Sequence, residues 1–219
     1  YYYGLKVHGL EKSMPTACVM LCLAEKGLNF EFVHVDLSKG EHKSHSFLSK
    51  NPFGKIPVFQ DGPITLFESR AITGYIAHKY KDLGTDLFRH DNIEEATMVG
   101  VWIEVESQHF SPPTTAIIFE MFIGPLFGHT TDQSVVNLNV EKLDKVFDVY
   151  EARLSNSKYL ACDSFSLADL HHLTYIYYLM KIAPCADLIN SRPHVKAWWQ
   201  DISARPSFVK VAQGLTLGE

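Results

Sequence analysis

The feature that most constrains the fold of this chain is a pair of short strands joined by a tight turn. A polar turn flanks this pair on each side. Residues 58–60 and 64–67 have the pattern of strands, and Asp61-Gly62-Pro63 between them is a turn sequence. The segment NPFGKIP at residues 51–57 precedes this hairpin, and ESRAI at residues 68–72 follows it where a helix begins. Together the two flanking turns predict a pocket.

The residue types in these turns indicate what the pocket accepts. A proline just before a strand can hold a tight turn, often with a cis bond, and leaves neighbouring backbone groups unpaired. Ile56, which precedes Pro57, is therefore expected to pair with an extended ligand. Glu68 and Ser69 lie at a helix start, where free amides favour an anionic group. We therefore expect a small peptide, with both charges at one of its ends.

The first 80 residues alternate between strand and helix patterns. Residues 5–8 are predicted as a buried strand, residues 15–26 as a helix that Gly27 ends, and residues 30–35 as a second strand. A strand-helix-strand crossover is the simplest topology for them. An irregular helix over residues 41–50 and the hairpin follow, and then an amphipathic helix over residues 69–80 with inward positions Ala71, Ile72, Tyr75 and Ile76. This order of elements resembles thioredoxin.

Everything after residue 91 has helical periodicity, which predicts a second, all-helical domain. Residues 81–91 break the pattern with glycine, aspartate and charges, so we expect domains over residues 1–82 and 91–219. The prolines of Ser111-Pro112-Pro113 are expected to bend or interrupt a long helical run. Helices are expected over residues 92–110, 113–121 and 135–154, over residues 166–182 with a capping box from Ser166 to Asp169, and from Pro193 onward. The predicted fold class is α+β.

Composition excludes several kinds of partner. A net charge of −5 gives no basic field, so we expect no nucleic-acid partner. No stretch approaches the roughly 20 apolar residues that span a bilayer, and no secretory signal profile is present, so we expect a cytoplasmic chain without a membrane partner. The sequence opens at Tyr1, which leaves a preceding leader open. The cysteines, Cys18, Cys22, Cys162 and Cys185, do not have the spacing of a disulfide framework.

Several motifs in a fixed order resemble one family. The segments NPFGKIP and ESRAI, with GEHK at residues 40–43 ahead of them, resemble the glutathione-binding half of plant phi-class glutathione transferases. The resemblance extends over most of the chain, through KVHG at residues 6–9, GTDL at residues 84–87 and SLADLHH at residues 166–172. It implies a thioredoxin-like glutathione-binding domain followed by an all-α domain that contributes a hydrophobic substrate site.

A group that follows the first strand is the expected catalyst, because ligands of α/β sheets lie beyond the carboxyl ends of the strands. This excludes Tyr1, Tyr2 and Tyr3 and leaves Glu11, Lys12, Ser13 and Thr16. The family resemblance implies that Ser13 is the thiol-activating serine. Its hydroxyl would hold glutathione as the nucleophilic thiolate. The alternative is a serine that only caps the first helix.

The resemblance also implies which residues hold the peptide. His42, Lys43 and Lys55 would bind the glycine carboxylate, Ile56 the cysteinyl backbone, and Glu68 with Ser69 the γ-glutamyl end. The alternative is that the lysines are ordinary surface residues and that Ser69 is a cap. The chain departs from the family where arginines usually follow the serine, since Ala17 and Cys18 stand there and Glu11 adds a negative charge. Weaker thiolate stabilisation is the expected consequence.

Apolar side chains from both halves are predicted to meet the second substrate. They are Leu10, Met14, Ile118, Phe119, Phe122 and Tyr178, although a stripe at helical spacing is more often core. We expect no metal site, because neighbouring helical histidines such as His171 and His172 point about 100° apart.

The resemblance therefore implies a homodimeric glutathione transferase that conjugates glutathione, as co-substrate, to small hydrophobic electrophiles. The resemblance also implies glutathione-dependent hydroperoxide reduction as a side activity and a partner-subunit contact at Phe53. One alternative is a carrier that binds small aromatic metabolites, such as hormones or flavonoids, without turnover. A second is thiol-disulfide exchange through Cys18, although no cysteine lies at the helix start that favours such chemistry.

Overall fold

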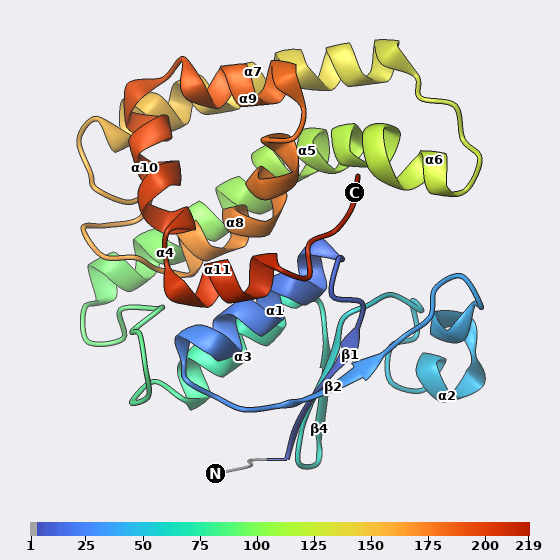
Figure 1. Cartoon of the computed structure of the whole chain (residues 1–219). Helices are drawn as coiled ribbons and strands as arrows, with labels where there is room; N and C mark the ends of the chain where they lie inside the picture. Colours follow the sequence, from blue (N-terminus) through green and yellow to red (C-terminus); the bar gives the residue numbers. More distant parts are fainter. Residues whose placement is uncertain (1–3) are drawn as a thin grey trace.

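The computed structural model describes residues 4–219 and consists of a sheet-bearing half and a helical half (Figure 1). Tyr1, Tyr2 and Tyr3, which open the first predicted domain and were excluded as catalysts, lie outside the described residues. The first half holds the strands β1 (Leu5–Gly9), β2 (Glu31–His34), β3 (Val58–Asp61) and β4 (Ile64–Phe67) in the order β2-β1-β3-β4. The predicted crossover is confirmed, because β1 and β2 are parallel, whereas β3 is antiparallel to both β1 and β4.

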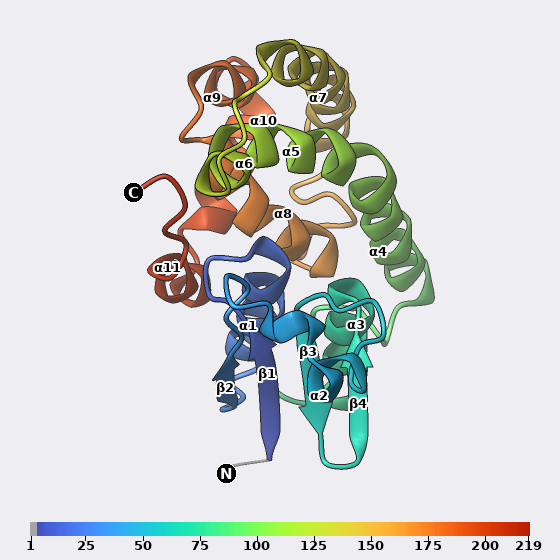
Figure 2. The ribbon, with the colours of Figure 1, turned by 90° about the vertical axis from the view of Figure 1, so that its right-hand side faces the viewer.

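Short and long helices cover the two faces of this sheet. The helices α1 (Met14–Glu25) and α3 (Ser69–Lys79) pack on one face, and α2 (His45–Leu48), with the 3-10 turn η1 (Glu41–Lys43), lies on the other (Figures 1 and 2). The predicted inward positions of α3 are partly wrong. Ala71 is exposed, whereas Thr73 and Ala77 are buried with Ile72 and Ile76. Because Thr73 is polar, nothing in the sequence indicated that it faces inward, and the buried face of the helix was predicted one residue too early.

The helical half continues from α4 to the C-terminus, and the predicted α+β class is confirmed. Its segments are α4 (Ile93–Val105), η2 (Glu106–Phe110), α5 (Ser111–Ile118), η3 (Phe119–Ile123), α6 (Gly124–Leu126), α7 (Gln133–Leu154), α8 (Leu167–Leu179), α9 (Ala183–Asn190), α10 (Pro193–Ser203) and α11 (Pro206–Ala212). The predicted capping box opens α8, which ends at Leu179 rather than near residue 182. The helices α9 and α11 were not predicted. Among residues 4–219, no helix combines the length and apolar character needed to cross a membrane.

The run from α4 to α6 continues past its prolines. The segments η2 and η3 are π-helical and immediately precede α5 and α6, whose first turns contain Pro112, Pro113 and Pro125. A proline is tolerated in a first helical turn, because its missing amide is not needed there. The predicted interruption therefore takes the form of a π-helical segment rather than a break.

Side-chain bonds tie the two halves together around α1 and α3. Arg70 in α3 makes a bidentate ion pair with the buried Glu106, with nitrogen-oxygen distances of 2.7 and 3.1 Å. At the end of α1, Glu25 accepts hydrogen bonds from Arg205 at 2.7 and 2.8 Å and from the hydroxyl of Thr85 at 2.7 Å. These contacts fix the interface on which a site between the halves depends.

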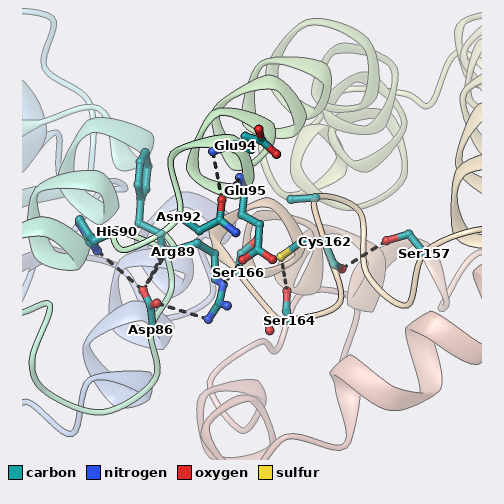
Figure 3. A network of polar contacts seen from close by, with 12 residues as sticks. Asp86, Arg89, His90, Asn92, Glu94, Glu95, Ser157, Cys162, Ser164 and Ser166 are labelled. Carbon is teal, nitrogen blue, oxygen red and sulfur yellow. Dashed lines mark hydrogen bonds and ion pairs between the residues drawn. The ribbon is translucent and has the colours of Figure 1, made fainter.

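The connection between α3 and α4 is ordered by its own polar contacts (Figure 3). The carboxylate of Asp86 accepts the amide of Arg89 at 2.9 Å, and Arg89 pairs with Glu95 at 2.6 Å. Asn92 caps α4 by accepting two backbone amides at 3.1 and 3.2 Å. The predicted division between residues 82 and 91 falls in this connection, and the independence of the two domains stays a prediction.

Two buried histidines give the fold a dependence on pH. Neighbours in α8, they point to different partners: His171 contacts the hydroxyl of Thr73 at 2.9 Å, and His172 contacts that of Tyr150 at 2.7 Å. Burial lowers the pKa of each imidazole to about 3. Both are therefore neutral in the folded chain, whereas in the unfolded chain they bind protons below about pH 6.5.

We expect acid to destabilise the chain in the window between these values, because there the unfolded chain binds a proton at each histidine that the folded chain does not bind. Each such histidine removes about 1.4 kcal/mol of unfolding free energy per pH unit below about pH 6. His171→Gln keeps a polar partner for Thr73 but cannot titrate, so it flattens the slope by about that amount. Denaturant unfolding across pH measures it, with the exposed His45→Gln as control. Parallel slopes for the wild type and His171→Gln contradict this account.

Candidate functional site

A pocket of about 530 Å³ lies where the two halves meet. The loop between β1 and α1 forms one wall, the segment after β2 a second, and the end of the α4 to α6 run a third. Ile56 and the C-terminal tail complete the lining. The full set is Leu10, Lys12, Ser13, Met14, His34, Asp36, Leu37, Ser38, Ile56, Ile123, Leu126, Phe127 and Leu217.

Ser13 stands at the N-cap of α1 and lines this pocket. Its carbonyl accepts the amide of Ala17 at 2.8 Å, and its own amide donates to Leu10 at 2.9 Å. Its side chain, however, makes no capping hydrogen bond. Capping and ligand binding therefore do not compete for this hydroxyl. It stays free to donate into the pocket, at the end of α1 where the helix dipole favours negative charge.

The turn that carries Ile56 is fixed from within. Asn51 donates from its side chain to the carbonyl of Lys55 at 2.7 Å, and the Ile56-Pro57 bond is cis. Among residues 4–219, neither the amide nor the carbonyl of Ile56 has a backbone partner. An extended ligand in the pocket can therefore pair with them.

Lys43 reaches this turn from η1. Its ammonium donates to the carbonyls of Phe53 and Gly54 at 3.2 and 3.0 Å, which leaves one of its three protons for a ligand. Gly54 has a φ of +59°, and a Cβ there would lie 2.8 Å from the carbonyl oxygen of His42. A side chain at residue 54 would therefore push the turn away from η1.

Glu68 has a strained backbone. Its φ is 70° and its ψ 109°, a conformation that non-glycine residues rarely adopt. The residue stands at the N-cap of α3, its side chain is exposed, and neither it nor that of Ser69 makes a capping bond. Backbone strain of this kind costs about 1–3 kcal/mol and clusters at ligand-binding positions. The strain supports the choice of Glu68 and Ser69 as ligand contacts.

Of the predicted peptide contacts, Ile56 lines the pocket, whereas the others lie outside its lining: His42, Lys43, Lys55, Glu68 and Ser69. Lys55 is exposed next to Ile56, and His42 is half-buried in η1 with its Nδ1 atom unpaired among the described residues. Their roles, like those of Lys43, Glu68 and Ser69, stay predictions.

The structure places the predicted hydrophobic contacts in two groups. Leu10 and Met14 line the pocket. The other four do not, for different reasons: Ile118 and Tyr178 are buried in the core, Phe119 packs on His129, and Phe122 packs on Tyr178 behind the wall. Residues that sequence reasoning missed stand in their place, notably Ile123, Leu126, Phe127 and Leu217.

Other missed residues follow β2. His34, Asp36, Leu37 and Ser38 line the pocket because the carboxyl ends of the parallel strands β1 and β2 meet at one edge. Because ligands lie beyond the carboxyl ends of parallel strands, the residues after the second predicted strand could have been predicted as pocket residues. Asp36 accepts hydrogen bonds from the hydroxyl of Ser38, the ammonium of Lys39 and the amides of both residues. The Ser38 hydroxyl and then the Lys39 ammonium lower the pKa of its carboxyl most, to about 2. Asp36 therefore shapes its own turn.

The residues that depart from the family pattern do not line the pocket, although Glu11 stands between the lining residues Leu10 and Lys12. Ala17 and Cys18 are fully buried, and Glu11 is exposed. Burial raises the pKa of the Cys18 thiol to about 12, and Thr174 contacts its sulfur at 3.2 Å. Cys18 is thus a protonated core residue, which argues against thiol-disulfide exchange through it. Within residues 4–219, no group of three or more His, Cys, Asp or Glu side chains could hold a metal ion.

Known proteins resemble the chain over nearly its whole length. The N-terminal domain of glutathione S-transferase matches residues 4–78, and the C-terminal domain of glutathione S-transferase matches residues 110–206. Glutathione S-transferase F13 from Arabidopsis thaliana is 53% identical over 214 residues, which cover 98% of this chain and 97% of that protein.

Solved structures agree with these matches. The crystal structure of glutathione transferase F7 from Populus trichocarpa has a TM-score of 0.94 and 57% identity, and covers 97% of this chain and 99% of its own. Glutathione S-transferase I from maize, in complex with an atrazine glutathione conjugate, has a TM-score of 0.91 and 44% identity, with 99% and 100% coverage. The chain belongs to the glutathione S-transferase family, in its plant phi class.

Proposed function

We propose that this chain is a glutathione transferase that joins the glutathione thiolate to small hydrophobic electrophiles, with Ser13 as the catalytic residue. The observation that carries the proposal is that the Ser13 hydroxyl makes no capping hydrogen bond and lines an apolar pocket at the N-terminus of α1. Family membership supports the same activity. The solved complex of the maize relative contains an atrazine glutathione conjugate, which is the product type of such a reaction.

The reaction needs the sulfur as an anion. A free thiol has a pKa of about 8.5, so most glutathione is protonated at neutral pH. The Ser13 hydroxyl donates a hydrogen bond to the sulfur and, with the helix dipole, favours loss of the thiol proton to solvent. The thiolate then forms a carbon-sulfur bond, and the leaving group departs with the bonding electron pair. Ser13 keeps its own proton throughout.

The peptide lies along the edge of the sheet in this proposal. The free amide and carbonyl of Ile56 pair with its cysteinyl unit, and the strained N-terminus of α3 at Glu68 and Ser69 holds the γ-glutamyl end. His42, Lys43 and Lys55 surround its glycine carboxylate. Each group meets a ligand group of complementary charge or hydrogen-bonding type.

The electrophile occupies the apolar side of the pocket, between the loop that carries Leu10 and Met14 and the wall formed by Ile123, Leu126 and Phe127. Leu126 and Phe127 are 64% and 70% exposed, so this wall is open to poorly soluble molecules. Ile118 and Tyr178 are buried, so they could contact the substrate only if their side chains moved.

A conjugation assay with an aryl halide tests the proposal. We expect turnover that saturates with both glutathione and the halide and yields the thioether. A chain that binds small aromatic molecules but gives no thioether above the uncatalysed rate, in the wild type as in Ser13→Ala, is instead the carrier considered above. The same preparation tests hydroperoxide reduction, the proposed side activity.

A homodimer and a cytoplasmic location complete the proposal. Phe53 is 65% exposed and packs only loosely on Phe67, with ring centroids 6.2 Å apart, which suits insertion into a partner subunit. The four cysteines are free thiols, as expected in a reducing compartment. Sedimentation equilibrium that gives twice the chain mass supports the dimer, and a single chain mass refutes it.

A further inference from the structure

Tyr178 lies behind the pocket and contacts segments from both ends of the chain. Its side chain is fully buried in α8. The hydroxyl donates to the carbonyl of Lys12 at 2.8 Å, directly before Ser13, and accepts the amide of Leu217 in the C-terminal tail at 3.5 Å. Lys12, Ser13 and Leu217 all line the pocket. One hydroxyl therefore joins two walls of the pocket that are more than 200 residues apart in sequence.

Further contacts hold the tail against α8. Lys181, one turn after Tyr178, donates to the carbonyl of Leu217 at 3.1 Å and pairs with Glu219 at 3.2 Å. Gly218 has a φ of +81°, and a Cβ there would lie 2.7 Å from the ring of Phe122, so the tail passes close over that ring. Leu217 is consequently 6% exposed, although it lies two residues from the end of the described chain. Figure 1 shows the tail returning from α11 toward α6.

The neighbouring tyrosine gives a natural comparison. Tyr177 shares the cation of Lys181 with Tyr178, at 5.2 and 5.6 Å from the ring centroids, and its ring packs on Phe208. Among residues 4–219, however, its hydroxyl has no hydrogen-bond partner. The hydroxyl of Tyr178 is the one that reaches the pocket walls, which packing alone does not require, because phenylalanine would fill the same space.

We propose that Tyr178 is a positioning residue: it fixes the distance between the loop that carries Ser13 (residues 10–14, the serine loop) and residues 213–219 (the C-terminal tail). The position of the tail in turn controls the affinity for the electrophile. The inference rests on the proposed function. Without the hydroxyl, the Lys12 carbonyl and the Leu217 amide lose a buried partner, and both segments relax toward water. Ser13 then points less accurately at the sulfur, and Leu217 withdraws from the apolar wall.

Three variants separate this role from simple packing. Tyr178→Phe removes both hydroxyl bonds. Lys181→Met removes the bonds of Lys181 to the tail but leaves those of Tyr178 in place. Tyr177→Phe removes a hydroxyl that holds neither segment. We expect Tyr178→Phe to raise the KM for an aryl halide about tenfold and to shift the pH profile of kcat/KM to higher pH. Lys181→Met raises the KM with an unchanged pH profile, and Tyr177→Phe changes neither.

Two measurements without turnover keep the inference separate from the proposed function. Hydrogen exchange should become faster in residues 10–14 and 213–219 of Tyr178→Phe, but only in residues 213–219 of Lys181→Met. Affinity for anilinonaphthalene sulfonate, an apolar probe, should fall about tenfold in both variants. Unchanged exchange and affinity in folded Tyr178→Phe overturn the inference, and equal effects in Tyr177→Phe reduce it to packing. A wild type without conjugation refutes only the proposed function.

Discussion

Ser13→Ala is expected to lower the conjugation rate with saturating glutathione roughly 25-fold at pH 7, because a sulfur pKa of about 6.5 instead of about 8.5 raises the thiolate fraction from about 3% to about 76%. The expectation follows from thiolate stabilisation of about 2.7 kcal/mol, which one charge-assisted hydrogen bond and a helix dipole together supply. The loss should shrink as pH rises toward the pKa of free glutathione, because the thiolate then forms without help. Steady-state kinetics across pH measures both effects.

The same variant has a second expected result, in stability. A capping serine contributes about 1 kcal/mol, but the Ser13 side chain makes no cap bond. We therefore expect Ser13→Ala to change the free energy of unfolding by less than about 0.5 kcal/mol. Ser13→Thr keeps a hydroxyl and serves as the matched control. An alanine variant that loses stability but keeps its activity makes Ser13 a structural cap.

Asp169→Ala is expected to destabilise the chain by about 3–4 kcal/mol, the largest effect on stability that we predict. Its fully buried carboxylate accepts the backbone amides of Leu160 and Ser166, each at 3.1 Å, and the indole of Trp198 at 2.9 Å. Burial raises the pKa of this carboxyl to about 6, although the hydrogen-bond donors act to lower it. The group is therefore ionised at neutral pH. The substitution leaves three buried donors unpaired and removes half of the capping box of α8.

Equilibrium denaturation in urea measures this loss. Asp163→Ala is the control, because Asp163 lies in the loop just before α8 and is exposed. We expect the midpoint of the Asp169 variant alone to move to much lower urea. A shift below about 1 kcal/mol would mean that the donors find water or other partners, and the loop before α8 would then be less tightly buried than the structure indicates.

Local patterns predicted much of the sheet-bearing half because the determining contacts are close in sequence. The hairpin, the Ile56-Pro57 turn and the Ser166 capping box each depend on a few adjacent residues. The placement of Ser13 at a helix start followed from the strand before it. The family resemblance supplied the peptide contacts, which spacing alone left open.

The apolar wall was harder to predict because helical periodicity does not state which face meets a pocket. Ile118 and Phe122 are apolar, as a substrate wall requires, but the π-helical segment η3, which ends at Ile123, changes the helix phase before Leu126. Leu217 belongs to the tail, whose position depends on contacts with Tyr178 in α8 and with Lys181 in the turn after it, both distant in sequence. No local signal carries such long-range contacts.

The acidity of bound glutathione tests the central claim most directly. Ultraviolet difference absorbance of the thiolate, titrated over pH for the wild type and Ser13→Ala with saturating glutathione, gives the sulfur pKa in each. We expect a value about two units below that of free glutathione in the wild type, and a return close to the free value in the variant. Equal values in the two proteins would contradict a role for the Ser13 hydroxyl in holding the thiolate.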